Sequence, residues 1–516
     1  MSLKGSDAAR SARAAHTGRT GAGGTRRGSL SDRPALHPDT IYPEYPFDAR
    51  APEHGPLATR NGAYAAVRES LRLLGLDAKR FGTREWNPLG ELIAPGERVL
   101  LKPNAVLDRH ALGLDPYAII THPSVLRALV DYCVVAQAGT ITIADAPQFN
   151  ADFERYLEVT RLDSIVTLHR SLGREVELLD LRRLSAATED GVVRATSRRS
   201  RSGDPLGYAT IDLGAQSVFA TLPNCDRIYG ADYDRAVASS AHLGGKHLYC
   251  VARSVLAADL FISVPKLKTH GKVGVTLNLK GLVGINGDKN YVPHYRIGPV
   301  ESGGDEYPSG LAKMERGSRA AQRFLIDRLL SRGDARGEAI YRRLTRAKQA
   351  VGAVLRQGGV LPKRPSLASS LSAGEWYGND TAWRMTADLA RILLYSDRDG
   401  AMRDAPQRRF LSVVDGIVAG EGDGPLEPRP RDCGLVLAGF NPALVDEAAA
   451  AVMGIDRALL PQLRVHDEKR WILRAPLEAA RVASEGEART LTLRDLAARS
   501  LQFELPIGWK GARRAS

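Results

Sequence analysis

Short runs of aliphatic and β-branched residues alternate with stretches of helical periodicity, and this alternation limits the folds open to the chain. The strand-like runs are bounded by Gly, Pro or Asp and lie at residues 98–102, 140–144, 176–181, 259–264, 410–414 and 434–438. Helical periodicity is found at residues 63–74, 123–136, 152–162, 246–257, 380–395 and 443–453. Such alternation is typical of a mostly parallel sheet flanked by helices. The sequence therefore predicts an α/β fold with a basic helical insertion.

With 516 residues, the chain exceeds the usual size of one domain, so two or three lobes are expected. Residues 1–40 are rich in Gly, Ala, Ser and Arg, and we expect a disordered basic tail there, with a transit peptide as the alternative. An N-terminal α/β lobe would span 41–183 and a central segment 184–309. The basic helical insertion would span 310–372 and a C-terminal α/β lobe 373–516.

Taken alone, the net charge of +13 suggests a nucleic-acid partner, but the distribution of the charged residues along the sequence does not. Residues 310–365 carry fourteen Lys or Arg residues against four acidic ones, and residues 1–40 carry seven against three. The rest of the chain is nearly neutral, which argues against specific nucleic-acid binding. The insertion could instead be a lid or a contact for an acidic protein partner or a membrane surface, or simply a solvated basic face.

The cysteines and the hydropathy pattern indicate the cellular compartment of the protein. Cys133, Cys225, Cys250 and Cys433 are widely scattered and form no C-x-x-C motif, so no zinc ribbon or iron–sulfur cluster is expected. Reduced thiols of this kind are common in cytosolic proteins. No apolar run reaches the roughly 18–20 residues that span a bilayer. A cytoplasmic protein is predicted.

Polar or charged residues follow four of the strand-like runs. These strand ends are Lys102-Pro-Asn104, Asp145-Ala-Pro147, Pro265-Lys-Leu-Lys-Thr-His270 and Asp415-Gly416. In open parallel sheets, ligands bind beyond the carboxyl ends of the strands. Lys102, Asp145, His270 and Asp415 are therefore expected to line one cleft.

The segment from Val264 to Asn290 holds the densest set of candidate site residues. Its cations are Lys266, Lys268, Lys272, Lys280 and Lys289, and its glycines would let the backbone approach a ligand closely. His270 could transfer protons near neutral pH. An anionic phosphate or carboxylate ligand fits this composition, whereas the spacing matches neither a P-loop nor a dinucleotide fingerprint. The alternative is a solvated basic loop with turn glycines.

A second candidate is the acidic stretch Asp415-Gly-Ile-Val-Ala-Gly-Glu-Gly-Asp-Gly-Pro425. Asp415, Glu421 and Asp423 could bind a divalent metal such as Mg²⁺ or Mn²⁺, or one of them could act as a base. Turn chemistry explains the same residues equally well, because Asp often accepts hydrogen bonds from its own backbone in turns.

Several motifs occur together: Leu101-Lys-Pro-Asn104, Thr121-His-Pro123, Ile143-Ala-Asp-Ala-Pro147, Val264-Pro-Lys-Leu-Lys-Thr-His270, Leu277-Asn-Leu-Lys280, and Asp415-Gly-Ile with Glu421-Gly-Asp-Gly-Pro425, with Asp446 further on. This set resembles the domain of unknown function 362 family, whose members are often described as uncharacterised iron–sulfur centre proteins. Many relatives carry a ferredoxin-like cluster region, and this chain lacks those cysteines. The resemblance implies a common site and no established reaction.

The leading hypothesis is an enzyme that acts on an anionic small molecule. We assign the chemistry to His270, Lys268 and Asp145, and metal binding to Asp415, Glu421 and Asp423. Substrate binding is assigned to Lys102, Asn104, Lys266, Lys280 and Asn278. Two alternatives stay open: a non-catalytic cofactor-binding or maturation protein, and a redox accessory protein whose iron–sulfur partner is a separate chain.

Overall fold

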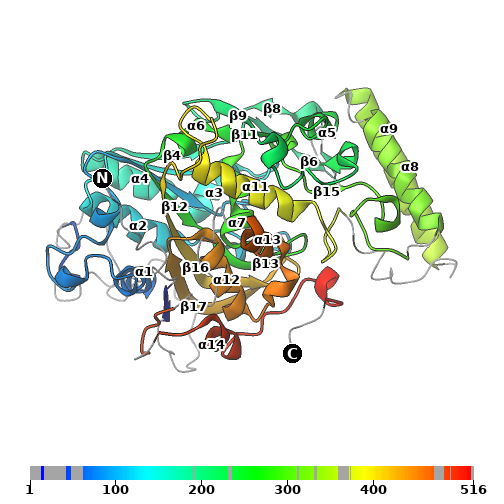
Figure 1. Cartoon of the computed structure of the whole chain (residues 1–516). Coiled ribbons are helices and arrows are strands. Elements are labelled where there is room, and N and C mark those ends of the chain that lie inside the picture. Colours follow the sequence, from blue (N-terminus) through cyan, green and yellow to red (C-terminus); the bar gives the residue numbers. More distant parts are fainter. Residues whose placement is uncertain are drawn as a thin grey trace.

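The computed structural model describes residues 13–16, 42–47, 62–189, 192–193, 195–230, 235–310, 313–329, 334–357, 371, 373–469, 482–487 and 490–512. A mixed, mostly parallel sheet runs through it in the order β1-β17-β16-β12-β2-β3-β4, with β13 and β14 branching from β16. Its strands are β1 (Arg13–His16), β2 (Arg98–Pro103), β3 (Thr140–Asp145), β4 (Val176–Asp180), β12 (Leu260–Val264), β13 (Lys266–His270), β14 (Gly274–Val275), β16 (Arg409–Glu421) and β17 (Arg429–Gly439). The predicted α/β fold class is confirmed (Figure 1).

Helices cover both faces of this sheet. One face packs against α1 (Gly62–Leu73), α2 (Pro123–Val135), α3 (Phe153–Thr160) and α4 (Leu162–Ser171). The other packs against α6 (Arg253–Ala257), α7 (Leu277–Gly281), α11 (Ala382–Tyr395), α12 (Pro442–Met453) and α14 (Leu493–Ala498). Successive strand residues alternate between the two cores: Leu100 joins one and Leu101 the other. Strands buried on both faces explain the continuous apolar runs in the sequence.

Smaller elements complete the fold. They are the paired strands β9 (Tyr208–Asp212) with β11 (Leu248–Ala252), β10 (Ile228–Tyr229) with β15 (Tyr295–Arg296), β5 (Leu184–Ser185) with β8 (Arg199–Ser200), and β6 (Thr188–Glu189) with β7 (Val192–Val193), and the helices α5 (Arg235–Ala241) and α13 (Pro461–Lys469). No helix within the described ranges is long and apolar enough to cross a membrane.

Residues typical of helix ends mark several of the predicted helices at the correct positions. Pro123 occupies the first turn of α2, where its missing N–H removes no helical hydrogen bond. Asn441 caps α12 by accepting hydrogen bonds from the backbone of Ala443 and Leu444. Gly454 ends that helix in the left-handed conformation that favours glycine.

Two expectations about secondary structure are wrong. Residues 248–252 form strand β11 rather than the start of a helix, because they pair antiparallel with β9; only Arg253–Ala257 is helical. The strand expected to stop before Asp415 continues to Glu421 as β16. Pairing with β13 on one side and β17 on the other extends it.

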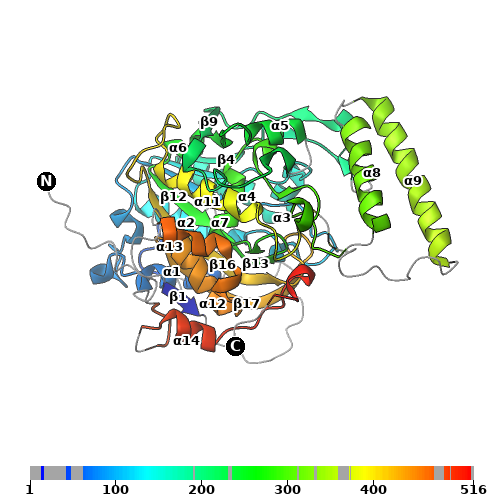
Figure 2. The same cartoon turned by 45° about the vertical axis from the view of Figure 1, so that its right-hand side comes forward.

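The basic insertion forms the helices α8 (Lys313–Leu329) and α9 (Ala335–Gln357), and this prediction is confirmed for the residues described. The two helices project from the edge of the molecule as a hairpin (Figure 2). Arg323 of α8 ties the hairpin to the body, donating to the hydroxyl of Tyr295 at 3.0 Å and forming an ion pair with Glu306. The predicted stretch 358–370 lies outside the described residues.

Most of the predicted basic tail also lies outside the described residues. Its residues Arg13–His16 differ from the expected disorder, since they form β1 and pair antiparallel with the outer strand β17. Edge strands expose unpaired backbone groups, so a short segment with little apolar surface can add to the sheet through main-chain hydrogen bonds.

Candidate functional site

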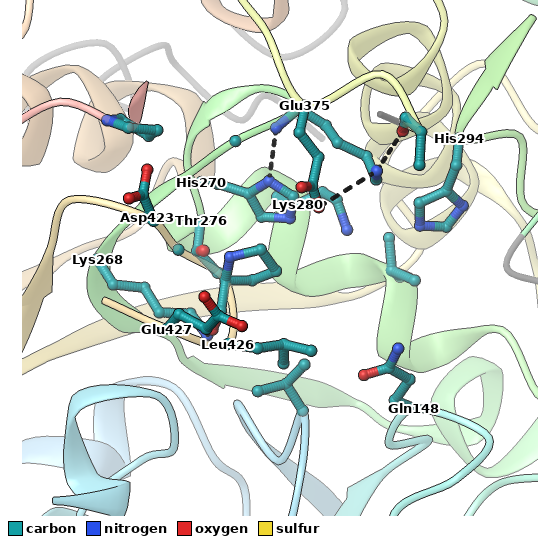
Figure 3. Close-up of a pocket in the computed structure, with 18 of the residues that line it drawn as sticks. Gln148, Lys268, His270, Thr276, Lys280, His294, Glu375, Asp423, Leu426 and Glu427 are labelled. Carbon is teal, nitrogen blue, oxygen red and sulfur yellow. Dashed lines mark hydrogen bonds and ion pairs between the residues drawn. The ribbon is translucent and has the colours of Figure 1, made fainter. Parts of the chain in front are cut away.

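A cavity of about 490 Å³ lies beyond the carboxyl ends of β2 and β3. Segments distant in sequence form its wall: the ends of these strands, β13, α7, the short helices η10 (Leu282–Ile285) and η11 (Lys289–Tyr291), residues 371, 373 and 375, and loops at 423–427 and 506–508. A volume of this size suits a small metabolite. Figure 3 shows labelled lysine, histidine and carboxylate side chains around it.

The structure divides the predicted site residues into two groups. Asn104, Asp145, Lys268, His270, Lys280 and Asp423 line the cavity. Lys102, Lys266, Asn278, Asp415 and Glu421 are not among its lining residues. Of the four strand-end residues expected to line one cleft, Asp145 and His270 line the cavity, whereas Lys102 and Asp415 do not.

Lys266 and Asp415 form a fully buried ion pair with an Nζ–Oδ2 distance of 2.7 Å. Asp415 also accepts hydrogen bonds from the backbone N–H groups of His122 and Ile417. The pair joins β13, β16 and the start of α2. Lys266 thus contacts a carboxylate of the protein instead of the predicted ligand anion, and both oxygens of Asp415 accept hydrogen bonds from groups of the protein.

Asn278, predicted to bind substrate, instead contacts two neighbouring elements. Its amide donates to Asp446 of α12 at 2.8 Å, and its side-chain oxygen accepts from Ser412 of β16 at 2.9 Å. Asp446 also accepts from the backbone N–H groups of Asn278 and Leu279. These contacts hold the first turn of α7, the helix that carries Lys280, and burial raises the pKa of Asp446 to about 7.

The two carboxylates after Asp415 bind neighbouring groups of the protein. Glu421 forms ion pairs with Arg429 and Arg431, and Asp423 accepts a hydrogen bond from the backbone of Ile507 at 2.7 Å. Among the residues that the structure describes, no three or more His, Cys, Asp or Glu side chains gather as a metal site would require. The structure does not bring the three predicted metal ligands together.

Lys102 lies behind the cavity wall and pairs with Asp145 at 2.8 Å. Asp145, which does face the cavity, also accepts a hydrogen bond from the backbone of Ala105. Gly284 packs directly against this ion pair: a Cβ there would overlap Asp145 and approach Lys102 Nζ to 2.7 Å. Glycine at this position therefore permits the close approach of η10 to the pair.

The lysines of the cavity wall differ in their partners. Lys268 donates to the carbonyls of Ile119 and Pro425, both at 3.0 Å. Lys289 donates to the carbonyls of Val283 and Asn286 at 3.0 and 3.1 Å. Within the described part of the chain, Lys280 has no hydrogen-bond or ion-pair partner.

Burial lowers the pKa values of these lysines. For Lys280 and for Lys289 the pKa falls to about 7, and for Lys268 it falls well below its usual value. Nearby cations add to the effect: Lys272 and Lys289 act on Lys280, and Lys280 acts on Lys268. The cavity therefore concentrates positive charge that is unfavourable without a ligand.

Two histidines of the wall have complementary tautomers. Nδ1 of His270 accepts from the backbone N–H of Lys272 at 3.1 Å, so its neutral ring carries the proton on Nε2. Nδ1 of His294 lies 2.9 Å from the carbonyl of Val292, so it carries the proton and leaves Nε2 as an acceptor. Burial, and then the charge of Lys280, lowers the pKa of both rings well below the usual value. This direction opposes the predicted proton transfer by His270 near neutral pH, which needs a pKa close to neutrality.

Several lining residues had no role assigned from the sequence. His294, Glu375 and Ile507 all line the cavity. Lys272 lies 3.6 Å from Glu375, and the indole of Trp509 donates to the carbonyl of Gly271 at 2.6 Å, which fixes the C-terminal segment against β13. His294 adjoins the basic segment and was within reach of sequence analysis, whereas the C-terminal segment carries no motif that marks it.

Comparison with known proteins gives a match over part of the chain. Residues 202–451 match the family model described as "Domain of unknown function (DUF362)". No curated protein matches the chain. The matched region includes β13, α7 and His294 but not the wall formed by the ends of β2 and β3.

Proposed function

From the premise that residues 202–451 are a DUF362 domain, we propose that the protein is an enzyme acting on a phosphorylated or carboxylated small molecule in this cavity. One observation carries the proposal. Lys268, Lys280 and Lys289 meet in a cavity of metabolite size, and their hydrogen-bond partners are backbone carbonyls or, for Lys280, none among the described residues. A ligand anion would supply the missing negative charge.

The residues around the anion suggest how a reaction could proceed. Lys280 and its neighbouring cations would hold the anionic group, while the Nε2–H of His270 would donate a hydrogen bond to the substrate. His294 carries its proton on Nδ1, so its Nε2 would accept a proton from the substrate once the bound anion has raised the pKa of the ring. Because the bound anion favours charged partners, it should raise the pKa values of the lysines and histidines, so binding should take up protons.

We infer the cellular location of the protein from its cysteines. All four are free thiols, and Cys133 and Cys250 are buried. Unpaired cysteines are usual where the compartment is reducing, which supports a cytoplasmic enzyme.

The test is anion binding by wild-type protein and two variants. Phosphate, sulfate and citrate are screened by melting temperature, and we expect at least one to stabilise the fold, by about 2–3 kcal/mol at a hundredfold excess over its Kd. The variant Lys280→Met should lose most of this shift, and Lys79→Met, which changes an exposed lysine that does not line the cavity, should keep it. If no anion stabilises wild type, or if Lys280→Met responds as wild type does, the proposal is wrong.

Calorimetric titration then measures proton uptake. Titrations in buffers of different ionisation enthalpy should show net uptake on anion binding at pH 7–8. Zero uptake with tight binding would contradict the assignment of the anion to Lys280 and its neighbours.

A further inference from the structure

We propose that Lys280 is a nucleophile that forms an imine with the carbonyl carbon of its substrate, which would therefore be an aldehyde or ketone bearing a carboxylate or phosphate. This inference rests on the proposed function and narrows its substrate class. It assigns Lys280 a covalent role, where anion binding requires only its charge.

The geometry distinguishes Lys280 from the other lysines of the site. Lys266 and Lys102 pair with carboxylates, and Lys272 lies beside Glu375. Lys268 and Lys289 each donate to two backbone carbonyls, which directs their N–H bonds into the protein. Lys280 borders the cavity from the end of α7 and has no such partner among the residues described. Among the cavity lysines that the structure describes, Lys280 is thus the one whose nitrogen donates no hydrogen bond to the protein.

The surroundings also favour the free amine of Lys280. Burial and the charges of Lys272, Lys289 and Lys102 lower its pKa to about 7. Near neutral pH, Lys280 is therefore a free amine in about half of the molecules, and its lone pair can attack a carbonyl carbon. An ordinary exposed lysine, with a pKa near 10.4, would be free amine in less than about one part in a thousand at pH 7.

Two histidines lie close enough to Lys280 for its charge to depress their pKa values, and Figure 3 draws Lys280 between them. Their tautomers suit the two proton movements of imine formation. The Nε2–H of His270 would polarise the carbonyl oxygen. The Nε2 of His294 would take a proton from the attacking nitrogen and return it to the oxygen.

The step balances without a further reactant. The nitrogen lone pair forms the C–N bond as the C=O π pair moves to oxygen, giving a carbinolamine. Both N–H protons of Lys280 then leave with that oxygen as water, and the C=N bond forms. Lys268 and Lys289 stay on the carboxylate or phosphate, and addition of water to the imine would regenerate the carbonyl group and the free amine of Lys280.

Reductive trapping tests this step. Full-length protein is incubated with glyoxylate, pyruvate, 2-oxoglutarate or glyceraldehyde 3-phosphate and cyanoborohydride, and modified lysines are located by peptide mass spectrometry. We expect an adduct at Lys280 with at least one probe, formed at pH 7 at least about tenfold faster than at the exposed Lys79. Its rate should rise with a midpoint near pH 7. Rates at Lys280 no greater than at Lys79 with every probe would overturn the proposal.

A charge-conserving variant separates this inference from the proposed function. Lys280→Arg keeps a cation and forms no imine, so it should lose the adduct while phosphate still raises its melting temperature. If wild type binds phosphate but yields no Lys280 adduct, the imine is wrong and the anion site stands. If phosphate, sulfate and citrate all fail to bind and no adduct forms, both proposals fail.

Discussion

The Lys266–Asp415 pair shows at the scale of single residues how charge can serve the fold. Two ionised groups are removed from water, and their burial is offset by their mutual attraction and by the two backbone N–H groups that also reach Asp415. Neither residue lines the cavity. Their effect should therefore appear in stability rather than in ligand affinity.

Asp415→Ala should lower the free energy of unfolding by about 3–5 kcal/mol, because it leaves Lys266 buried without its counter-ion. The double variant Lys266→Met/Asp415→Leu should recover much of that loss, since it removes both charges. Urea unfolding of the two single variants and the double variant measures the coupling. A double variant as unstable as the sum of the singles would show that the pair contributes nothing as a pair.

Because the pKa of Lys280 is lowered in the folded protein, we expect the stability of the fold to depend on pH. Its pKa is about 7 in the folded protein against an ordinary 10.5, so between these values the unfolded chain binds a proton that the folded chain lacks. The free energy of unfolding should therefore rise with pH across that window, and the penalty for burying the charge is complete below pH 7. Lys280→Met should raise the melting temperature of ligand-free protein most at pH 6 and flatten the rise.

The control for this measurement is Lys79→Met, whose lysine is exposed. It should leave the pH profile of the melting temperature as in wild type. A Lys280→Met variant that is less stable than wild type at pH 6 would contradict the prediction that the buried charge of Lys280 destabilises the fold.

At the scale of elements, the α8–α9 hairpin combines positive charge with exposed apolar side chains. Ile340, Leu344, Val351 and Val354 fall on one face of α9 by their spacing, and each is 44–66% exposed; Phe324 of α8 is 67% exposed. The insertion has fourteen basic residues against four acidic ones. An apolar stripe on a basic helix is the pattern of a segment that lies on an anionic membrane surface.

We therefore expect the full-length protein to sediment with phosphatidylserine-containing vesicles and not with phosphatidylcholine vesicles. Replacing Ile340 and Val354 by Ser should reduce this binding, because the apolar contact is lost while the charge remains. The matched control is Leu112→Ser, which alters a 60% exposed leucine outside the hairpin. Failure of wild type to bind phosphatidylserine vesicles would exclude the membrane, and equal binding by the hairpin variant and wild type would exclude the apolar face of α9 as the contact. Capture of an acidic protein by the same face would identify that partner instead.

At the scale of the whole molecule, the cavity exists because distant segments close over one end of the sheet. The ends of β2 and β3 lie outside the matched DUF362 region, while β13, α7 and His294 lie inside it, and the C-terminal segment adds Pro506 to Gly508. No one segment contains the site. Substitutions in the N-terminal part of the sheet should thus affect the same cavity as substitutions in the matched region.

The sequence determined the elements of this protein, because their causes are local. Apolar runs produce the buried strands, Pro123 and Asn441 begin helices, and Gly454 ends one. The same local patterns placed Asp145, Lys268, His270 and Lys280 at what is now the cavity wall. They could not tell which lysine faces a ligand, since Lys266 and Lys268 are only two residues apart on one strand.

The tertiary structure decided that question through strand register. Parallel pairing of β13 with β16 sets Lys266 opposite Asp415 and Lys268 opposite Gly420, so Lys266 is neutralised by a residue 149 positions away and Lys268 is not. The same long-range packing leaves Lys280 without a partner among the described residues and brings Ile507 to the cavity. Partner choice between residues so far apart depends on which surfaces the folded chain buries together, and no local pattern encodes it.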